Sequence, residues 1–303
     1  MGRAREAAHH SNESGGGGGF TRGGAARKPP YPLIGVDTVL VVGESINSTI
    51  RRVGEAINNR DAAFIAELAR EQVAAGAAML DVNAGVADGD EAENLLWAIR
   101  TVQEAVDVPL VIDSTAPKAV EAALEVHRGR PVLNSISGEV RKLQSLLPLV
   151  AESGCGVILL CLDDRGVPKT AAERCAVAQS LVEQAVSANV ALEDLYIDPL
   201  VLTVGSDWQA ARVALEALHL IRAALPQVRT IAGVSNVSFG MPQRSLLNRT
   251  FLAMAVAFGL DTVMVNVRDK ALTATLWAAN ALAGSDTYCS DYLDAYHEGK
   301  LTV

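Results

Sequence analysis

The stretch PLVIDSTAPKAVEAALEVH, residues 109–127, holds one complete strand–helix unit. Its apolar run Pro109–Ile112 ends at the polar residue Asp113, and a segment with helical spacing of apolar residues follows through His127. That segment opens with Thr115-Ala116-Pro117, and proline suits the first turn of a helix because its missing N–H would have no partner there. The pattern therefore predicts a buried strand, a short turn and a helix.

This unit recurs eight times along the chain. The predicted strands are Val39–Gly43, Ala78–Leu80, Pro109–Ile112, Pro131–Leu133, Val157–Leu160, Leu195–Ile197, Ile231–Val234 and Thr262–Val265. The polar or thiol residues that follow them are Glu44, Asp81 with Asn83, Asp113, Asn134, Cys161 with Asp163, Asp198, Asn236 and Asn266. Alternating strands and helices require a parallel sheet. Eight units favour a closed (β/α)8 TIM barrel, in which catalytic groups lie at the C-terminal strand ends.

Helical periodicity fills the segments between the strands. The predicted helices cover residues 61–75, 90–105, 115–127, 139–153, 171–188, 207 to just before 226, 242–258 and 270–283. An open doubly wound sheet is the alternative topology, but a nucleotide-binding sheet of that kind carries a GxGxxG loop after its first strand. Residues 43–47 read Gly-Glu-Ser-Ile-Asn instead, which favours the barrel.

Residues 1–30 differ in composition from the rest of the chain. They contain the run Gly15–Gly19 and scattered arginines, with no apolar face that could join a core. We expect a disordered glycine-rich tail there. Residues 31–303 then form a single barrel domain of about 270 residues, close to the ~250 typical of this fold.

The charge balance argues against nucleic acid as a partner. Of 26 basic and 35 acidic side chains, five basic and two acidic ones fall in residues 1–30. The barrel domain therefore carries 21 against 33, a net charge near −12. Binding to a phosphate backbone needs a basic face.

Cysteine usage and hydropathy point to the cytoplasm. The four cysteines show no CxxC spacing and no disulfide-rich density, as in proteins of a reducing compartment. No apolar run reaches the ~18 residues of a membrane span, so we expect no membrane association.

No catalytic metal is expected, because His127, His219 and His297 fall on helices or near the end of the chain and no HExxH motif occurs.

The strand-end residues can recognise a flat heterocycle. A carboxylate accepts two parallel N–H bonds, as from an amino-pyrimidinone edge, and a carboxamide both donates and accepts. Any single one of these residues could instead cap a helix or form hydrogen bonds with the backbone of a loop. For Asp113, Asn134, Asp198 and Asn236 taken together, the surrounding sequence favours a binding role.

Six segments carry that surrounding sequence: GESIN (43–47), LDVNAG (80–85), VIDST (111–115), VLNSISGE (132–139), YIDPLVL (196–202) and residues 233–261. They resemble the pterin-binding methyltransferases, which include methyltetrahydrofolate:corrinoid protein methyltransferases and the folate domain of cobalamin-dependent methionine synthase. The resemblance runs from about Val39 to Tyr292. It implies a (β/α)8 barrel, in agreement with the strand and helix pattern.

The resemblance also implies roles for individual residues. Asp113 would bind the amino-pyrimidine edge of the pterin, Asn134 the same ring system, and Asp198 its other donors. Asn236 would reach N5, the nitrogen that carries the methyl group. With Asp113 and Asp198, Asn236 is assigned to catalysis. Four further family positions would line or support the pocket: Glu44, Asn47, Asp81 and Asn83. Arg244 would lie on the loop after strand seven, near the exit of the folate tail.

The implied reaction moves a methyl group between 5-methyltetrahydrofolate and a corrinoid. The corrinoid would be carried on a partner protein, because the sequence has no DxHxxG signature. Asn236 is neutral, so it would hold N5 through a network that ends in water or a carboxylic acid. A homodimer is the family expectation, and the direction of transfer is open. Two alternatives stay open: a transferase like dihydropteroate synthase, and a non-catalytic pterin-binding module.

Overall fold

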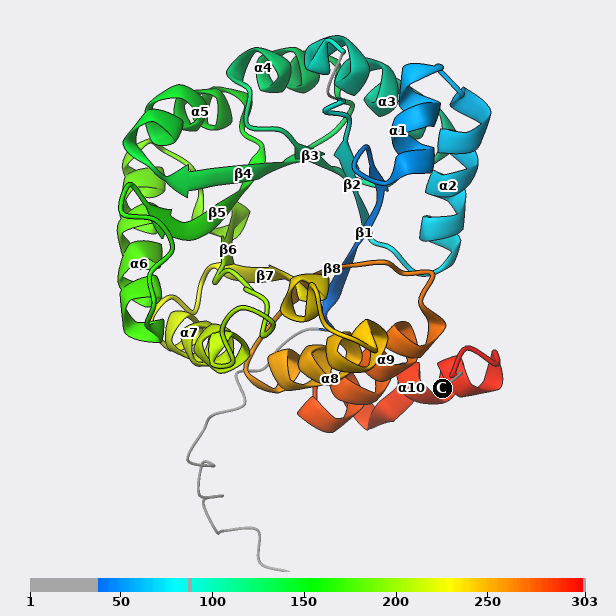
Figure 1. Cartoon of the computed structure of the whole chain (residues 1–303), viewed down its shortest axis with the longest axis vertical. Helices are drawn as coiled ribbons and strands as arrows, with labels where there is room; N and C mark the ends of the chain where they lie inside the picture. The colour runs from blue at the N-terminus through cyan, green and yellow to red at the C-terminus, as the bar shows by residue number, and fades with distance from the viewer. Residues whose placement is uncertain (1–37, 87–88, 302–303) are drawn as a thin grey trace, which may run out of the picture. The chain divides into compact units, whose positions relative to one another are not determined.

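A computed structural model describes residues 38–86 and 89–301 and confirms the predicted barrel. Eight parallel strands close into a ring in chain order, with β1 paired to both β2 and β8 (Figure 1). The strands are β1 Leu40–Asn47, β2 Met79–Asn83, β3 Leu110–Asp113, β4 Val132–Gly138, β5 Gly156–Asp163, β6 Leu195–Asp198, β7 Arg229–Gly233 and β8 Thr262–Val265. The predicted tail and its boundary at residue 30 lie outside the described residues.

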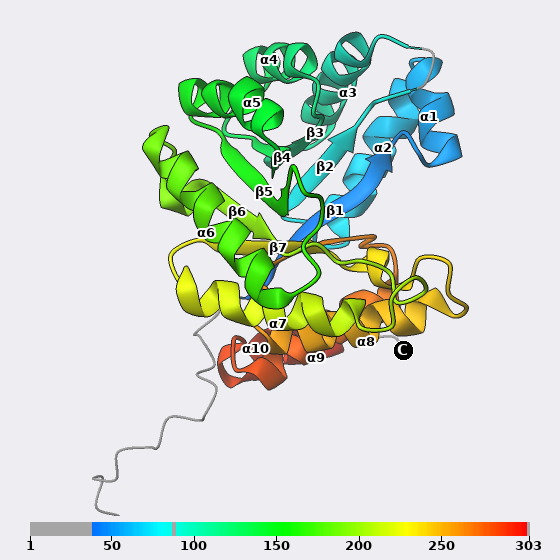
Figure 2. The same cartoon turned by 60° about the vertical axis from the view of Figure 1, so that its left-hand side comes forward.

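Helices surround the ring of strands on its outer side, and α10 packs beside α9 (Figures 1 and 2). They are α1 Arg51–Asn58, α2 Ala62–Ala74, α3 Glu91–Ala105, α4 Pro117–Val126, α5 Val140–Ser153, α6 Ala171–Ser187, α7 Ala210–Ala224, α8 Arg244–Ala257, α9 Lys270–Ala283 and α10 Ser290–His297. Three short 3₁₀ segments complete the described elements: η1 Leu192–Asp194, η2 Val234–Ser238 and η3 Thr287–Cys289.

Local capping explains where several helices begin. The Asp61 side chain accepts a hydrogen bond from the backbone N–H of Phe64, which caps α2. Thr170 and Glu173 form a reciprocal capping box at the start of α6. Each interaction satisfies a backbone donor that the first helical turn leaves open. Asp61 and Thr170 therefore mark the starts of two of the predicted helices.

Two helices were not predicted from the sequence. Helix α1 has only eight residues, no side-chain N-cap bond and an internal glycine, all of which weaken a helical signal. A Cβ on Gly54 would lie 2.6 Å from the carbonyl oxygen of Ser48, so the close approach of the chain requires glycine there. Helix α10 is fixed by Asp286, whose carboxylate accepts from the backbone N–H groups of Asp291 and Tyr292.

Side-chain alternation divides the apolar core into an inner and an outer part. The inner part fills the barrel and comprises Val42, Met79, Val111, Val132, Ile158, Tyr196 and Ile231. The outer part lies between the strands and the helices and includes Leu110 and Ile112 of β3. Because successive strand residues point to opposite faces, Val111 faces the interior while its two neighbours face the helices.

A buried ion pair links α7 to the segment before β8. The Arg222 Nη1 atom lies 2.9 Å from Asp261 Oδ2, and both side chains are at most one-tenth exposed. The second Asp261 oxygen accepts from the backbone N–H of Thr230 at 2.8 Å. The pair therefore joins α7, β7 and β8 away from the strand C-termini.

Candidate active site

A polar layer lies directly above the inner apolar core, at the C-terminal ends of the strands. The inward-facing positions two residues beyond core residues are polar on five strands: Glu44 after Val42, Asp81 after Met79, Asp113 after Val111, Asn134 after Val132 and Asp198 after Tyr196. Because side chains alternate between the two faces of a strand, these polar residues point to the same side of the sheet as the core residues. The tertiary structure thus brings together residues that are more than 150 positions apart.

Several of these residues lie inside strands, whereas the sequence pattern placed them after the strands. Glu44 lies within β1 and Asn134 within β4, and both strands continue past them. The reason is that backbone pairing does not stop at the first polar side chain when the neighbouring strand also continues. In β4, Asn134 and Ser137 still pair with β5.

Two hydrogen bonds join the acidic and amide side chains of strands β2, β3 and β4. The Asn134 Nδ2 atom donates to Asp81 Oδ1 at 3.1 Å. The Asn83 Nδ2 atom donates to Asp113 Oδ2, also at 3.1 Å. Asp81 is fully buried, while the other three are partly accessible. Asp81 therefore supports Asn134, whose Oδ1 has no partner among the described residues, while Asn83 supports the more accessible Asp113 side chain.

Asn83 and Asn47 have structural partners that account for most of their polar atoms. Asn83 Oδ1 accepts from the Ser48 hydroxyl at 2.6 Å, so both ends of its carboxamide are engaged. Asn47 Oδ1 accepts from the backbone N–H and the hydroxyl of Thr49 and so forms the turn that leads into α1. These two predicted pocket residues support the mouth of the barrel.

Asp198 ends β6, and the turn that follows holds it in place. Its Oδ1 atom accepts from the backbone N–H of Leu200 at 2.7 Å. Arg174 of α6 donates to the carbonyl oxygens of Pro199 and Leu200 at 2.9 and 2.6 Å. Leu200 has a φ of 66°, a backbone conformation that costs energy for a residue with a Cβ. Arg174 therefore fixes the turn that orients Asp198.

Arg244 is the first residue of α8, whereas the resemblance placed it on the preceding loop. Its Nη2 atom donates to the Ser235 carbonyl oxygen at 3.0 Å, and its Nε atom donates to the Ser238 hydroxyl at 3.1 Å. The segment η2 folds as a 3₁₀ turn between β7 and α8, and these bonds draw α8 back toward it. Arg244 also lines a cavity of about 320 Å³ together with Glu44.

Asn236 lies in η2 and is exposed at the mouth. Its backbone carbonyl accepts from the N–H of Phe239 at 3.2 Å. Its carboxamide makes no hydrogen bond to another described residue. The side chain is therefore available to a ligand above the polar layer.

Burial dominates the electrostatics of the polar layer. It raises the pKa of Asp81 well above its usual range, and the nearby Asp113 carboxylate adds to this effect. Burial also raises the pKa of Asp113, although the hydrogen bond from Asn83 opposes the change. Desolvation raises the pKa of Asp198 to about 6, although the hydrogen bond from the backbone N–H of Leu200 acts to lower it. These acids lie close together in surroundings that disfavour their charged forms.

Sequence reasoning missed Arg174, Ser48 and Ser235. Arg174 did leave a signal, since it lies on the same helix face as the buried residues Val177, Ala178 and Leu181, where a charge needs a partner. Ser48 and Ser235 left none, because their contacts depend on how distant strands meet. Cys161 is fully buried between the barrel and its helices and does not face the mouth.

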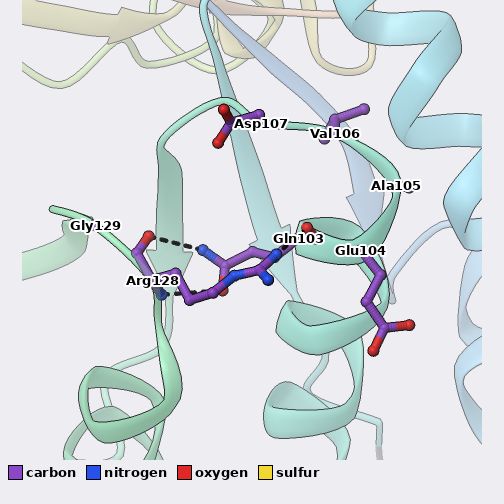
Figure 3. Close-up of a pocket in the computed structure, with 7 residues that line it drawn as sticks. All are labelled: Gln103, Glu104, Ala105, Val106, Asp107, Arg128 and Gly129. Atoms are coloured by element: carbon purple, nitrogen blue, oxygen red, sulfur yellow. Dashed lines mark hydrogen bonds between the residues drawn. The ribbon is translucent and has the colours of Figure 1, made fainter.

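A second hollow, of about 600 Å³, lies near the opposite end of the barrel (Figure 3). Reciprocal hydrogen bonds between Gln103 and Arg128 connect the ends of α3 and α4 there. In TIM barrels this face contributes to stability, and the chemistry occurs at the other face.

Among residues 38–86 and 89–301, no cluster of three metal-ligating side chains occurs, and no helix is long and apolar enough to span a membrane.

The fold and the polar layer define a barrel enzyme whose mouth is shaped for a ligand rich in hydrogen-bonding groups. A family model described as pterin binding enzyme matches residues 43–266, most of the chain. The chain belongs to this family of pterin-binding enzymes.

Two kinds of sequence relative share this similarity. The methylcorrinoid:tetrahydrofolate methyltransferase of Eubacterium limosum is 32% identical over 265 residues, which cover 87% of this chain and 98% of that protein. The methionine synthase of Mycobacterium tuberculosis is 28% identical over 243 residues, 76% of this chain but 20% of that much longer protein. The match to the first relative therefore extends over nearly its whole length.

Solved structures confirm the fold. The dihydropteroate synthase of Clostridium difficile superimposes with a TM-score of 0.66 at 20% identity, over 81% of this chain and 97% of that one. The dihydropteroate synthase of Thermus thermophilus gives a TM-score of 0.61 at 23% identity, over 80% of this chain and 94% of that one. At this level of identity the likeness establishes the architecture alone.

Proposed function

We propose that this protein transfers a methyl group between N5 of 5-methyltetrahydrofolate and the cobalt of a corrinoid carried on a partner protein. The Eubacterium limosum relative supports this proposal, because its name gives both a methylcorrinoid and tetrahydrofolate, and because it matches this chain along nearly its entire length. The methionine synthase relative matches over 76% of this chain. The proposal covers both directions of transfer.

The observation that carries the proposal is the set of unengaged acceptors in the polar layer. Asp113 keeps Oδ1 free of other described residues, and Asp198 keeps Oδ2 free. Asn134 donates its N–H to Asp81, so its Oδ1 is left to accept. A pterin presents an amino group and ring N–H groups along its edge. Such donors match these acceptors, while a phosphate or a carboxylate would be repelled.

We assign the pterin-binding roles to Asp113, Asn134 and Asp198, and the contact with N5 to Asn236. N5 must gain a proton as the methyl group leaves, so a hydrogen bond to N5 stabilises the transition state more than the ground state. Asn236 can hold N5 in position, but its carboxamide cannot supply the proton. The corrinoid supplies the nucleophile or the methyl group, and the barrel supplies orientation and exclusion of water.

Calorimetry with tetrahydrofolate tests the binding part of this proposal. Asp198→Asn should weaken binding by about tenfold or more, because its buried carboxylate would lose charge-assisted bonds to the ring. Glu193→Gln, a matched change at an exposed acid of η1, should have no effect. Equal tetrahydrofolate affinities of the two variants would contradict pterin binding at this site.

A methyl-transfer assay tests the catalytic part. We expect the protein to exchange methyl groups between methyltetrahydrofolate and cob(I)alamin. Binding of the folate without any transfer to a corrinoid would instead indicate a non-catalytic module. Condensation of aminobenzoate with a pterin pyrophosphate would indicate a synthase of the dihydropteroate type.

We further propose a cytoplasmic homodimer. Helices α9 and α10 lie side by side (Figure 2). Large apolar side chains are exposed on them and on the short segment η3 between them: Leu282 of α9, Tyr288 of η3 and Tyr296 of α10. All four cysteines are free, which is consistent with a reducing compartment. Sedimentation at micromolar concentration should give twice the monomer mass. A monomeric species at that concentration would contradict the dimer.

A further inference from the structure

Glu44 is a largely buried carboxyl group without an ion-pair partner. Among the described residues, no basic side chain lies within 4 Å of it, although Arg244 is close enough to act on its charge. The groups of Arg244 that donate hydrogen bonds are directed to Ser235 and Ser238 instead. The neutral Ser235 side chain is its hydrogen-bond partner, so no ion pair offsets the cost in stability of burying the charged form of Glu44.

The surroundings of Glu44 connect it with the predicted N5 site. Its side chain interacts with that of Ser235, and Ser235 is the neighbour of Asn236 in η2. Both Glu44 and Ser235 line the cavity of about 320 Å³, whose other polar walls include Arg244, Asn248 and Asn266. A cavity of this size and polarity can hold several water molecules. It therefore has room for water that could carry protons between Glu44 and Ser235, the residue before Asn236.

We propose that Glu44 is the proton-supplying residue of methyl transfer and acts on N5 through Ser235, Asn236 and water in this cavity. The inference rests on the proposed function. In the direction from folate to corrinoid, the N5–methyl bond breaks and its electron pair stays on N5. The reduced corrinoid contributes the electron pair of the new bond to the methyl carbon. N5 takes one proton, and Glu44 becomes a carboxylate that regains a proton from solvent.

The reverse direction requires the opposite change. The nitrogen of tetrahydrofolate attacks the methyl group of the methylated corrinoid and must lose one proton. Glu44 as a carboxylate accepts this proton by the same path. The two directions therefore need Glu44 in opposite protonation states, and they should respond to pH with opposite signs.

The electrostatics around Glu44 suit a group that exchanges protons near neutral pH. Burial raises its pKa to about 7, while the hydrogen bond with Ser235 and the charge of Arg244 act in the other direction. The Asp81 carboxyl of β2 is close enough for its charge to interact with that of Glu44, and it interacts in turn with Asp113 of β3. From α9, the N-cap Asp269 lines the same cavity.

Several charged side chains on α1 and α2 and after β8 lie at the surface and form ion pairs with one another. Their ion pairs are Arg51–Glu55, Arg52–Asp61, Arg70–Glu67 and Arg268–Glu71. Exposed pairs of this kind act weakly on a buried group. The protonation of Glu44 is therefore governed by its burial, by Arg244 and by the acids of the polar layer.

Single-turnover stopped flow between pH 5.5 and 8.5 tests the proposal, with saturating methyltetrahydrofolate and cob(I)alamin as probes. The wild-type rate should fall as the pH rises through about 7, and Glu44→Gln should lower the rate at pH 6 by about 100-fold and abolish this inflection. With methylcobalamin and tetrahydrofolate, the wild-type rate should instead rise through the same pH range. Glu71→Gln, at the exposed acid of α2 paired with Arg268, should keep the wild-type profile.

The outcomes separate this inference from the proposed function. A Glu44→Gln variant that binds folate and keeps the inflection overturns the role of Glu44 but leaves the methyl transfer intact. A wild-type protein that transfers no methyl group overturns both. If Glu44→Gln fails to fold, Arg244→Gln serves instead: loss of its positive charge should move the inflection to higher pH, and an unchanged midpoint overturns the inference.

Discussion

Asn134 of β4 donates a hydrogen bond to Asp81 of β2 across the intervening strand β3, with 3.1 Å between Nδ2 and Oδ1. Side chains of alternate strands meet in this way because those of a TIM barrel stack in layers, each supplied by every second strand. The contact fixes the orientation of the Asn134 carboxamide. Its oxygen is left without a partner among the described residues, and Asp81 serves as the buried support of Asn134.

Substitutions at Asp81 and Asp113 should therefore separate support from ligand contact. Asp113→Asn should weaken tetrahydrofolate binding by roughly 10- to 100-fold, because a charged acceptor is lost. Asp81→Asn should change the affinity by less than about threefold, because burial already disfavours the charged form and a carboxamide oxygen accepts from Asn134 equally well. Calorimetry at pH 7 gives both values. A larger loss for Asp81→Asn would reverse the two roles.

Asn236→Ala should slow methyl transfer more than it weakens folate binding. Loss of one hydrogen bond that strengthens in the transition state costs about 3–4 kcal/mol, roughly 100- to 1000-fold in rate. Stopped flow at saturating folate measures the transfer step, and calorimetry measures the ground-state affinity. If the transfer rate is unchanged, Asn236 has no part in the chemical step.

Glu44 should make the ligand-free protein less stable at high pH. Its folded pKa of about 7 lies above the ordinary 4.5, so the folded state binds more protons between these values, and this contribution to stability is lost as the pH rises from about 4.5 to 7. Glu44→Gln should therefore stabilise the protein at pH 8 by up to about 3 kcal/mol relative to the wild type, with a smaller difference at pH 5. Urea unfolding at both pH values tests this. A variant less stable than the wild type at pH 8 would contradict the assignment.

Asp261→Ala should strongly destabilise the fold without acting on the site. The change leaves Arg222 buried without its carboxylate, which typically costs about 3–5 kcal/mol. Glu67→Ala, which breaks the exposed pair with Arg70 on α2, should cost less than about 1 kcal/mol. Urea unfolding compares the two variants, and folate affinity of the folded fraction should stay unchanged in both. Similar losses of stability would mean that the Arg222–Asp261 pair contributes little.

Local patterns in the sequence were sufficient to predict the barrel and the face on which its polar strand-end residues lie. Short apolar runs that alternate with helical periodicity leave a parallel sheet as the solution, and the polar residue at the end of each run, such as Asp113 or Asp198, then lies at one mouth. Caps such as Thr170 act within a few residues, so they too could be predicted. Helix α1 escaped prediction because its formation depends on the close approach of Gly54 to Ser48.

The roles within the mouth depended on the tertiary structure. Whether an asparagine contacts a ligand or supports a neighbour is decided by partners from other strands: Asn83 is engaged at both ends of its carboxamide, while Asn134 keeps one oxygen free. The protonation behaviour of Glu44 likewise follows from burial and from Arg244, 200 positions along the chain. Hydrogen-bond direction and desolvation are properties of the assembled barrel, because they arise only when distant segments exclude water together.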